Sequence, residues 1–419
     1  MCSPSRRWWR KRRRSSAADS LIGQERFHAD RERRRLGSLT AYCGPTHSGK
    51  TKKLEAEAER AERQRRGVQR FSGLHTPSAT PPQAEGNIAA IAEAIDPATD
   101  MVVIDEAQRF GEDLIGLADD LATGARIDVV VAGWELDATG TPSGPMPRML
   151  CAADLVLKLD DGVCAQRGCR NPASRTQRFQ ARGEDRYLPV CRRHHSAEPR
   201  PLAFQERWFE EPTGAVEVIA GCMFSGKTQE LIRRLDQERF AGAAIQAFKP
   251  ALDDRYALEA VASHRDIRFP ALAVPDVGEI RAQLRDDTRV VGMDEVQFFA
   301  SDIVKLAQEL ANEGRHVILA GLDLDFLARP FGPMPQLMAV ADRLTKLQAS
   351  CQFPGCGSRQ ATRTQRLVDG QPAAPDDPLI VVAGASAYEA RCRHHHEVRQ
   401  GARGAGSDLE PAEALLSQD

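Results

Sequence analysis

The chain repeats the pattern Gly-x-x-x-x-Gly-Lys-Thr, first at Gly44–Thr51 and again at Gly221–Thr228. After each occurrence, four further patterns follow in the same order: Asp-Glu-x-Gln, Gly-Pro-Met-Pro, Arg-Thr-Gln-Arg and Cys-Arg-x-His. They begin at Asp105, Gly144, Arg175 and Cys191 after the first occurrence, and at Asp294, Gly332, Arg363 and Cys392 after the second. Five shared patterns in one order indicate a tandem duplication of one folding unit, and we call the two halves copy one and copy two.

The bulk composition is that of a globular protein with two domains. The chain has 419 residues, of which 42% are hydrophobic and 28% charged, so each half is large enough to bury its own core. The formal net charge of -2 predicts no general affinity for nucleic acid or membrane surfaces. No apolar run approaches the roughly 20 residues that a membrane-spanning helix needs.

Positive charge is concentrated at the start of the chain. Residues 6–35 contain twelve Arg or Lys side chains, and no apolar stretch follows them, which argues against a secretory signal. We expect residues 1–37 to form a disordered basic arm; polyanion binding, or translation from upstream of the true start, are the alternatives. The small, acidic segment 401–419 is expected to be a disordered tail.

Short apolar runs alternate with helical segments in both copies, which predicts an α/β fold with two parallel sheets. Strands are expected at 39–43, 101–104 and 127–132 in copy one, and at 215–220, 289–293 and 317–320 in copy two. Helices are expected at 50–66, 228–239 and 302–313. The expected divisions are a basic arm (1–37), a first core (38–159), a first cysteine-bearing segment with a linker (160–212), a second core (213–348), a second cysteine-bearing segment (349–400) and a tail (401–419).

A glycine-rich turn between a strand and a helix points backbone N–H groups at an anion and forms a phosphate-binding loop, or P-loop. In copy two, Lys227 would contact the β- and γ-phosphates of ATP, and the Thr228 hydroxyl would ligate Mg²⁺. The Asp-Glu-x-Gln pattern, which we call the acidic box, would supply a second metal position and a proton acceptor that faces the substrate. The candidate ATP and magnesium residues are Gly221, Ser225, Gly226, Lys227, Thr228, Asp294 and Gln297. Copy one offers a second nucleotide site at Gly44, Gly49, Lys50, Thr51, Asp105 and Glu106.

Six of the ten cysteines fall into two copies of a metal-ligand pattern. The candidate ligand sets are Cys164, Cys169, Cys191 and His194 in copy one, and Cys351, Cys356, Cys392 and His395 in copy two. Three thiolates and one imidazole make a closed tetrahedral zinc set, so each copy is expected to hold a structural Zn²⁺; the adjacent His195, His394 and His396 are alternative ligands. This cysteine usage favours a reducing compartment, and we expect a cytoplasmic protein.

Copy two resembles the type II thymidine kinases, the zinc-containing family of cellular and bacterial thymidine kinases, over residues 214–398. The resemblance lies in residues 223–228, 248–256, 263–264, 294–299, 321–326, 329–332, 364–366 and 388–392. It implies a RecA-like P-loop core followed by a small zinc-binding lasso that closes over the nucleoside. It also implies transfer of the γ-phosphate of ATP to the 5′-hydroxyl of thymidine, and self-association, with two chains as one route to a pseudo-tetramer.

The resemblance further assigns roles to individual residues. It implies that Glu295 is the general base, and that Asp294 and Thr228 are the magnesium positions. The implied substrate-binding residues are Met223, Asp253, Arg255, Phe298, Leu322, Phe326, Thr364 and Tyr388.

Copy one departs from this pattern in length and in side chains. Its segment between P-loop lysine and acidic box spans 55 residues against 67 in copy two, and lacks the counterpart of 253–255. Trp134 and Ala138 stand where copy two has Leu322 and Phe326, and its lasso is shorter. We therefore expect copy two to be the catalytic unit and copy one to be a pseudo-kinase or a regulatory nucleotide-binding unit; a different phosphoryl acceptor is the alternative.

Three rival functions remain for the whole chain. One is a non-catalytic zinc-ribbon module that holds nucleic acid with the basic arm, which predicts salt-dependent binding with no nucleoside dependence. A kinase for another deoxynucleoside, such as deoxyuridine, would differ by one methyl contact, worth on the order of 1 kcal/mol. A nucleic-acid-dependent ATPase also pairs two RecA-like domains, but it would not explain the cysteine sets. ATPase stimulation by single-stranded DNA or RNA would identify it.

Overall fold

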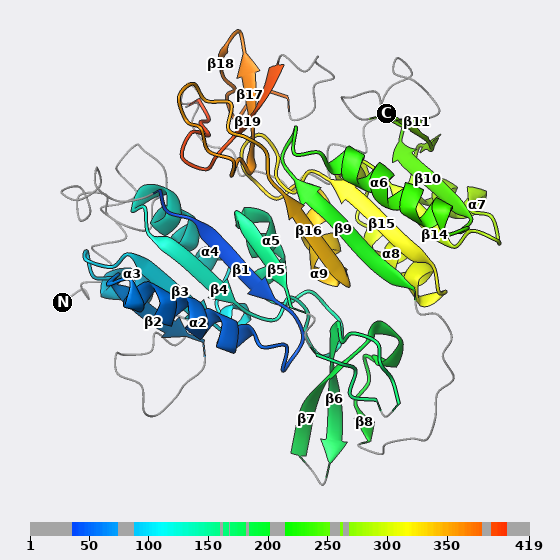
Figure 1. Cartoon of the computed structure of the whole chain (residues 1–419), viewed down its shortest axis with the longest axis horizontal. Coiled ribbons are helices and arrows are strands. Elements are labelled where there is room, and N and C mark those ends of the chain that lie inside the picture. The colour runs from blue at the N-terminus through cyan, green and yellow to red at the C-terminus, as the bar shows by residue number, and fades with distance from the viewer. Residues whose placement is uncertain are drawn as a thin grey trace, which may run out of the picture.

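The computed structural model describes residues 36–73, 88–159, 162–166, 168–181, 184–201, 214–251, 260–262, 268–378 and 387–399. The basic arm up to residue 35, residues 202–213 of the linker, the tail, and the candidate residues Asp253 and Arg255 lie outside them. Two parallel sheets, each followed by a small cysteine-bearing sheet, make up the described chain (Figure 1). This confirms the expected α/β fold and its duplication. Within these residues, no helix is both long enough and apolar enough to cross a bilayer.

Copy one folds around a five-stranded parallel sheet in the order β2-β3-β4-β1-β5. Its strands are β1 (Leu39–Cys43), β2 (Val68–Ser72), β3 (Met101–Asp105), β4 (Asp128–Ala132) and β5 (Leu155–Lys158). Its helices are α2 (Lys50–Arg63), α3 (Ile88–Ala94), α4 (Asp113–Asp119) and α5 (Met146–Ala152). The central strands are short and apolar along their length because helices cover both faces of a parallel sheet.

Copy two repeats this plan with a six-stranded sheet in the order β13-β10-β14-β15-β9-β16. Its strands are β9 (Ala215–Gly221), β10 (Ile245–Pro250), β13 (Leu272–Val274), β14 (Val290–Met293), β15 (His316–Gly321) and β16 (Arg343–Leu347). Its helices are α6 (Lys227–Phe240), α7 (Val277–Gln283), α8 (Ile303–Asn312) and α9 (Met334–Val340). The additional strand β13, and a two-stranded sheet of β11 (Ala260–Ala262) and β12 (Arg268–Pro270), lie in the stretch that is longer in copy two.

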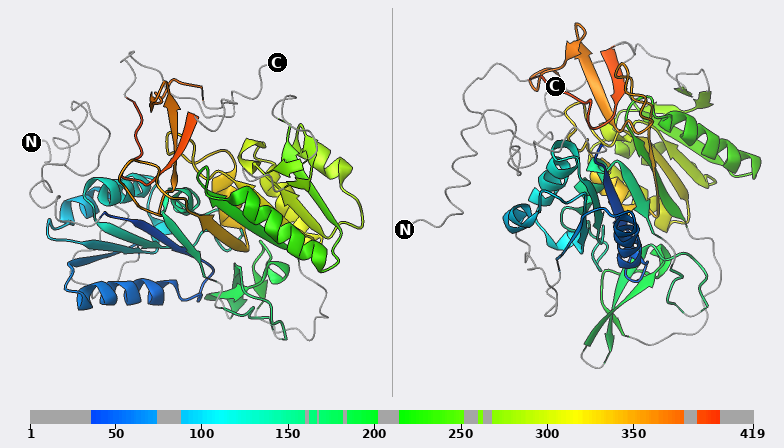
Figure 2. Two further views of the ribbon diagram at one scale, coloured as in Figure 1. Left: turned by 45° about the horizontal axis from the view of Figure 1, so that its top comes forward. Right: turned by 60° about the vertical axis from the view of Figure 1, so that its left-hand side comes forward.

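The two cores lie side by side, with edge strands β5 and β16 facing the junction (Figures 1 and 2). Helices α5 and α9 pack against each other there, and Cys151 Sγ lies 3.5 Å from Met338 Sδ. The largest apolar cluster contains buried side chains of both cores, including Met149 and Leu337. The copies therefore share one continuous hydrophobic core across the junction.

Matching lysines link each core to the other. Lys158 of β5 donates to Ala339 O of α9 at 2.9 Å, and Lys346 of β16 donates to Cys151 O of α5 at 2.6 Å. Each lysine also pairs with a buried carboxylate of its own copy, Glu135 or Asp323. Because each contact has its counterpart at the equivalent position, the two halves are related by an approximate twofold arrangement.

Each core is followed by a small cysteine-bearing sheet, the lasso of the sequence analysis, which we call lid one in copy one and lid two in copy two. The two lids lie on opposite sides of the junction, with lid two above it and lid one below it in the view of Figure 1. Lid one is the described part of residues 162–201, with β6 (Arg175–Ala181), β7 (Glu184–Val190), β8 (Arg200–Pro201) and a 3-10 turn at Arg192–His194. Lid two is the described part of residues 349–399, with β17 (Arg363–Val368), β18 (Gln371–Pro372) and β19 (Tyr388–Arg391). Cross-strand pairing of Arg178 with Tyr187 and of Arg366 with Tyr388 shows that the two tyrosines are equivalent.

Copy one carries one more residue than copy two between the acidic box and the next strand. Strand β4 begins 23 residues after Asp105, whereas β15 begins 22 residues after Asp294. The chain absorbs this residue in a π-helical turn at Asp120–Gly124, directly after α4. Single π-turns of this kind mark insertions that a helix accommodates without losing its register elsewhere.

The expected elements agree with the structure except at their ends. Helix α2 ends at Arg63 rather than at residue 66, because Arg65 adopts a left-handed conformation with φ 60°. The expected strand and helix at the start of copy two are β9 and α6, each one or two residues longer than predicted.

Candidate nucleotide and acceptor site

In copy two, the P-loop runs from the last residue of β9 to the first residue of α6. Gly221 has φ 149°, and a Cβ there would lie 2.5 Å from Leu347 O and 2.8 Å from Ser225 Oγ, so only glycine fits. Gly226 precedes the helix with φ 89°. Lys227 is buried and donates to Cys222 O at 2.8 Å, inside the loop. The loop therefore has the backbone that a phosphate cradle requires.

The acidic box meets the P-loop through one hydrogen bond. Thr228 Oγ1 donates to Asp294 Oδ2 at 2.8 Å, which brings together two candidate magnesium positions from α6 and the end of β14. Burial and the neighbouring Glu295 raise the pKa of Asp294 to about 7. A cation at this position would therefore relieve an unfavourable buried charge.

Glu295 is fixed by its backbone and by Gln297. Its φ of 53° is left-handed, a strained conformation for a residue other than glycine. Gln297 Nε2 donates to Glu295 Oε2 at 2.6 Å, and Gln297 Oε1 accepts from the backbone N–H of Leu322 at 3.0 Å. Gln297 thus links the carboxylate after β14 to the loop after β15. This loop, residues 322–326, carries candidate contacts to the thymine, and we call it the acceptor loop. The NH₂ and the C=O of the Gln297 side-chain amide are both used in this way.

Lid two reaches over the same edge of the sheet. The backbone N–H of Met223 in the P-loop donates to Thr364 Oγ1 of β17 at 3.1 Å. Two positions further along β17, the Arg366 guanidinium lies 5.2 Å from the centre of the Phe326 ring. Tyr388 pairs with Arg366 across the small sheet. The structure therefore connects the lid candidates to the ends of β9 and β15, which are adjacent strands.

Phe298 packs against its own core loop, with its ring edge-on to Phe331 at 5.4 Å between centroids.

Copy one preserves the phosphate-binding half of this geometry. Thr51 Oγ1 donates to Asp105 Oδ2 at 2.8 Å, and Gln108 bridges Glu106 and the backbone N–H of Trp134 at 2.7 and 3.0 Å. Glu106 has φ 54°, one degree from the value at Glu295. The candidate second nucleotide site thus has the same arrangement of loop and acidic box.

The acceptor half of copy one is different. The Trp134 and Tyr187 rings lie 5.9 Å apart between centroids, at an angle of 51°. These side chains occupy the positions of Leu322 and Tyr388 in copy two. The counterpart of Phe326 is Ala138. In copy one, two aromatic side chains therefore pack against each other at positions where copy two has a leucine and a tyrosine.

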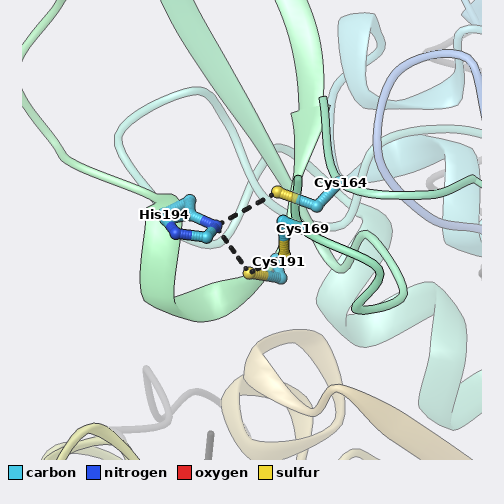
Figure 3. Close-up of side chains that lie close together, drawn as sticks. All are labelled: Cys164, Cys169, Cys191 and His194. Atoms are coloured by element: carbon cyan, nitrogen blue, oxygen red, sulfur yellow. Dashed lines mark hydrogen bonds between the residues drawn. The ribbon is translucent and has the colours of Figure 1, made fainter. Parts of the chain in front are cut away.

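Each copy brings its four predicted zinc ligands into one cluster, with all ligand atoms within 4.8 Å of one another (Figure 3 shows the set of copy one). His194 Nδ1 lies 3.3 Å from both Cys164 Sγ and Cys191 Sγ, and Cys169 Sγ lies 3.9 Å from Cys191 Sγ. In copy two, His395 Nδ1 lies 3.2 Å from Cys392 Sγ. Tetrahedral zinc would separate its ligands by about 3.8 Å for two sulfurs and about 3.6 Å for sulfur and nitrogen, so both sets fit the ion.

The alternative histidine ligands point elsewhere. His195 Nε2 lies 3.0 Å from Ala138 O, and His396 Nε2 lies 2.9 Å from Phe326 O, at equivalent positions of the two copies. His394 Nε2 lies 2.8 Å from Gly37 O. These three histidines connect the lids to the cores.

A P-loop joined to an acidic box, with a Cys₃His lid above it, is the architecture of a P-loop kinase, here present twice. Residues 37–195 and residues 214–396 each match the thymidine kinase family. The chain therefore belongs to the thymidine kinase family as a tandem duplicate. Its enzyme class is ATP:thymidine 5′-phosphotransferase, and the family uses ATP with Mg²⁺.

Sequence reasoning missed one buried pair beside the site. Lys346 Nζ lies 2.6 Å from Asp323 Oδ2, and both side chains are completely buried next to Leu322. Asp323 belongs to the Gly-Leu-Asp-Leu-Asp-Phe pattern of copy two, but nothing in the sequence marks Lys346 as its partner. Asp323 follows β15, whereas Lys346 lies in β16, and only the fold brings them together.

Proposed function

We propose that copy two carries the thymidine kinase activity and that copy one is a pseudo-kinase. The observation that carries this proposal is the contact between the Trp134 and Tyr187 rings in copy one. The family resemblance puts the equivalent positions, Leu322 and Tyr388, around the thymine base. In copy one these positions are engaged with each other, and no phenylalanine stands at Ala138 to line the base.

In copy two, Glu295 accepts the proton of the thymidine 5′-hydroxyl as the oxygen attacks the γ-phosphorus of ATP, whose bond to the β,γ-bridging oxygen breaks so that ADP leaves. Gln297 orients this carboxylate through the 2.6 Å hydrogen bond, and the left-handed backbone holds it at the end of β14. Lys227 and the P-loop N–H groups bind the phosphates and neutralise their charge. The acceptor and the phosphate are thereby held in line, which is the main demand of phosphoryl transfer.

Different residues bind the thymine ring and the metal ion. Met223, Leu322, Phe326, Thr364 and Tyr388 surround the thymine, and closure of lid two over them excludes water that would otherwise hydrolyse ATP. The family resemblance assigns Asp253 and Arg255, which lie outside the described residues, to positions near the sugar and the transferred phosphate. Thr228 and Asp294 would hold Mg²⁺, which supplies further charge neutralisation at the phosphates.

Copy one retains a nucleotide site without an acceptor site. The matching 2.8 Å contacts of Thr51 with Asp105 and of Thr228 with Asp294 support nucleotide binding in both halves. Copy one would then bind ATP without transferring its phosphate, and its effect on copy two would depend on the bound nucleotide.

Matched substitutions of Glu295 and of its counterpart in copy one, Glu106, test the assignment. Glu295→Gln should lower the rate of phosphoryl transfer from ATP to thymidine by about 100-fold or more, because general-base catalysis is worth about 10²–10⁴-fold. Glu106→Gln, the same change in copy one, should leave the rate within about 3-fold. The reverse pattern would place the chemistry in copy one, and equal losses would mean that both copies turn over.

The same assay addresses the acceptor and the assembly. Deoxyuridine in place of thymidine tests the alternative acceptor, since only the methyl contact differs. We propose that the chain self-associates further, so that two chains present four P-loops. Sedimentation of the wild-type chain as a monomer would contradict this.

A further inference from the structure

Lid two is hydrogen-bonded to copy one as well as to its own core. Arg393 Nε donates to Asp154 Oδ2 at 2.7 Å, and Thr362 Oγ1 donates to Asp154 Oδ1 at 2.8 Å. Arg393 and Arg363 each also donate to Ala152 O, at the end of α5, at 2.9 Å. Asp154 is fixed in turn by the backbone N–H of Leu39 at 2.9 Å. A buried carboxylate of copy one is thus the common acceptor for the start of β17 and for the zinc turn of lid two.

The charges at this contact belong together. Arg393 and Arg363 are buried, and Asp154 is nearly so. Burial alone would raise the pKa of Asp154, but the two guanidinium groups outweigh it and hold this pKa well below its usual range. Removal of the carboxylate would leave two buried cations with one fewer acceptor, so the lid could not keep its position without rearranging.

The contact is adjacent to the candidate acceptor site. Thr362 and Arg363, which contact copy one, directly precede Thr364, which accepts the P-loop N–H of Met223. Arg366, which lies against Phe326, follows on the same strand. The residues that contact copy one, Thr362 and Arg363, therefore lie within four positions of Thr364 and Arg366, which contact the P-loop and Phe326 of copy two.

Lid one has the reciprocal arrangement. Asp342 of copy two accepts from Ser174 at 2.6 Å and from Arg192 at 2.7 Å, and Arg175 lies 3.1 Å from it. Asp342 is likewise fixed by a backbone N–H, that of Val216, at 2.9 Å. Asp154 and Asp342 are therefore equivalent residues, each of which holds the lid of the other copy.

The two anchors are not equal. Arg393 also pairs with Asp119, at the end of α4, and donates to Thr123 at 3.3 Å within the π-helical turn of copy one. The counterpart of Asp119 in copy two is the uncharged Gln308. Lid two is thus held by two carboxylates of copy one, whereas the ion pairs of Arg175 and Arg192 within the described chain involve Asp342 alone.

We propose that Asp154, together with Asp119, is a positioning residue for the kinase reaction of copy two. Copy one contributes to catalysis by fixing the base of lid two, so that Thr364 and Arg366 meet the P-loop and the acceptor loop. This rests on the proposed assignment of catalysis to copy two. It gives copy one a role that requires neither nucleotide binding nor turnover.

Asp154→Asn and Asp342→Asn form a matched pair for the test, since each removes one equivalent carboxylate and keeps its size. Asp154→Asn should raise the KM for thymidine at least 10-fold and change the KM for ATP less than 3-fold. Asp342→Asn should change neither by more than 3-fold. Hydrogen exchange supplies an independent measurement: Asp154→Asn should speed exchange in residues 362–368 and 388–391, and Asp342→Asn in residues 175–181 and 184–190.

Equal kinetic effects of the two variants, or unchanged exchange in lid two of Asp154→Asn, would overturn the proposal. If Asp342→Asn were the variant that weakens thymidine binding while both exchange patterns held, the assignment of catalysis to copy two would be wrong. Lid anchoring would then stand without the role proposed for Asp154.

If Asp154→Asn does not fold, Asp119→Asn replaces it, because this carboxylate is half exposed. It should raise the KM for thymidine about 3-fold, and no change would again overturn the proposal.

Discussion

Thr51 Oγ1 donates to Asp105 Oδ2 at 2.8 Å, the same distance that separates Thr228 Oγ1 from Asp294 Oδ2. The two hydrogen bonds lie at equivalent strand ends of two sheets whose acceptor loops have diverged. If copy one binds nucleotide but no thymidine, as we propose, phosphate binding and acceptor binding are separable in this fold. The first depends on backbone and a few polar atoms, and the second on the side chains of a loop and a lid.

Nucleotide stoichiometry should show both P-loops. Calorimetric titration with Mg²⁺ and a non-hydrolysable ATP analogue should give two sites per wild-type chain and one in Lys227→Ala. The double variant Lys50→Ala/Lys227→Ala should show none, because each lysine supplies the charge that faces the phosphates. A single site in the wild-type chain, lost in Lys227→Ala, would contradict binding by copy one.

Metal content should separate the two clusters. The wild-type chain should hold two zinc ions, and Cys191→Ser and Cys392→Ser should each hold one, since three ligands bind zinc far more weakly than four. Kinase activity should fall at least 10-fold in Cys392→Ser, whose cluster lies in lid two, and remain within about 3-fold in Cys191→Ser. Plasma mass spectrometry and the phosphoryl-transfer assay measure both quantities. Full activity of a one-zinc Cys392→Ser protein would disconnect the cluster of lid two from catalysis.

Acid should weaken the junction between the copies. The pKa values of Asp154 and Asp342 both lie below their usual range. Burial alone would raise them, but each carboxylate has a pair of neighbouring arginines that together outweigh this effect. A depressed folded pKa stabilises the fold above the unfolded pKa of about 3.9, and this stabilisation is lost as pH falls further. Thermal unfolding should therefore show a steep loss of stability below about pH 4. Asp342→Asn should be less stable than wild type at pH 6 and should lose less between pH 5 and pH 3. Parallel curves for the two proteins would argue against the ion pair.

The buried pair beside the acceptor loop should be costly to break on one side. Lys346→Met should lower the free energy of unfolding by about 3–5 kcal/mol, because it leaves Asp323 as an unpaired charge with no exposure. The double variant Lys346→Met/Asp323→Asn should recover part of this loss. Lys305→Met, at a lysine that is 81% exposed, is the control and should change stability by less than about 0.5 kcal/mol. Urea unfolding measures all three, and equal losses for Lys346→Met and Lys305→Met would show that the pair contributes nothing.

The sequence predicted the parts of the fold that local patterns determine. The P-loops, the apolar strands that precede them and the two Cys₃His sets depend on residue type and spacing, and the structure contains each of them. The resemblance of copy two to the thymidine kinases, together with the duplication, extended this to both copies, and the match of residues 37–195 and 214–396 to that family confirms it. The roles of individual site residues remain predictions, and Asp253 and Arg255 lie outside the described residues.

The junction could not be predicted because its residues look ordinary in sequence. Asp154 and Asp342 resemble solvent-exposed acids, and their partners lie about 240 and 150 positions away. Helices α5 and α9 have seven residues each, too few for a helical period to stand out, and their formation depends on packing against each other. The single extra residue in copy one shows in the sequence as 39 positions from Asp105 to Gly144 against 38 from Asp294 to Gly332, but only the structure locates it in the turn at Asp120–Gly124.

The crossed position of the lids constrains how such a chain can diverge after duplication. A half-chain made by cutting within residues 202–213 would carry a lid whose arginines have their carboxylates on the missing fragment. Selection can therefore erase the chemistry of one half while it must preserve that half's surface. Copy one is free to lose its acceptor pocket, but Asp154 can change only in step with Arg393, across the boundary between the two former genes.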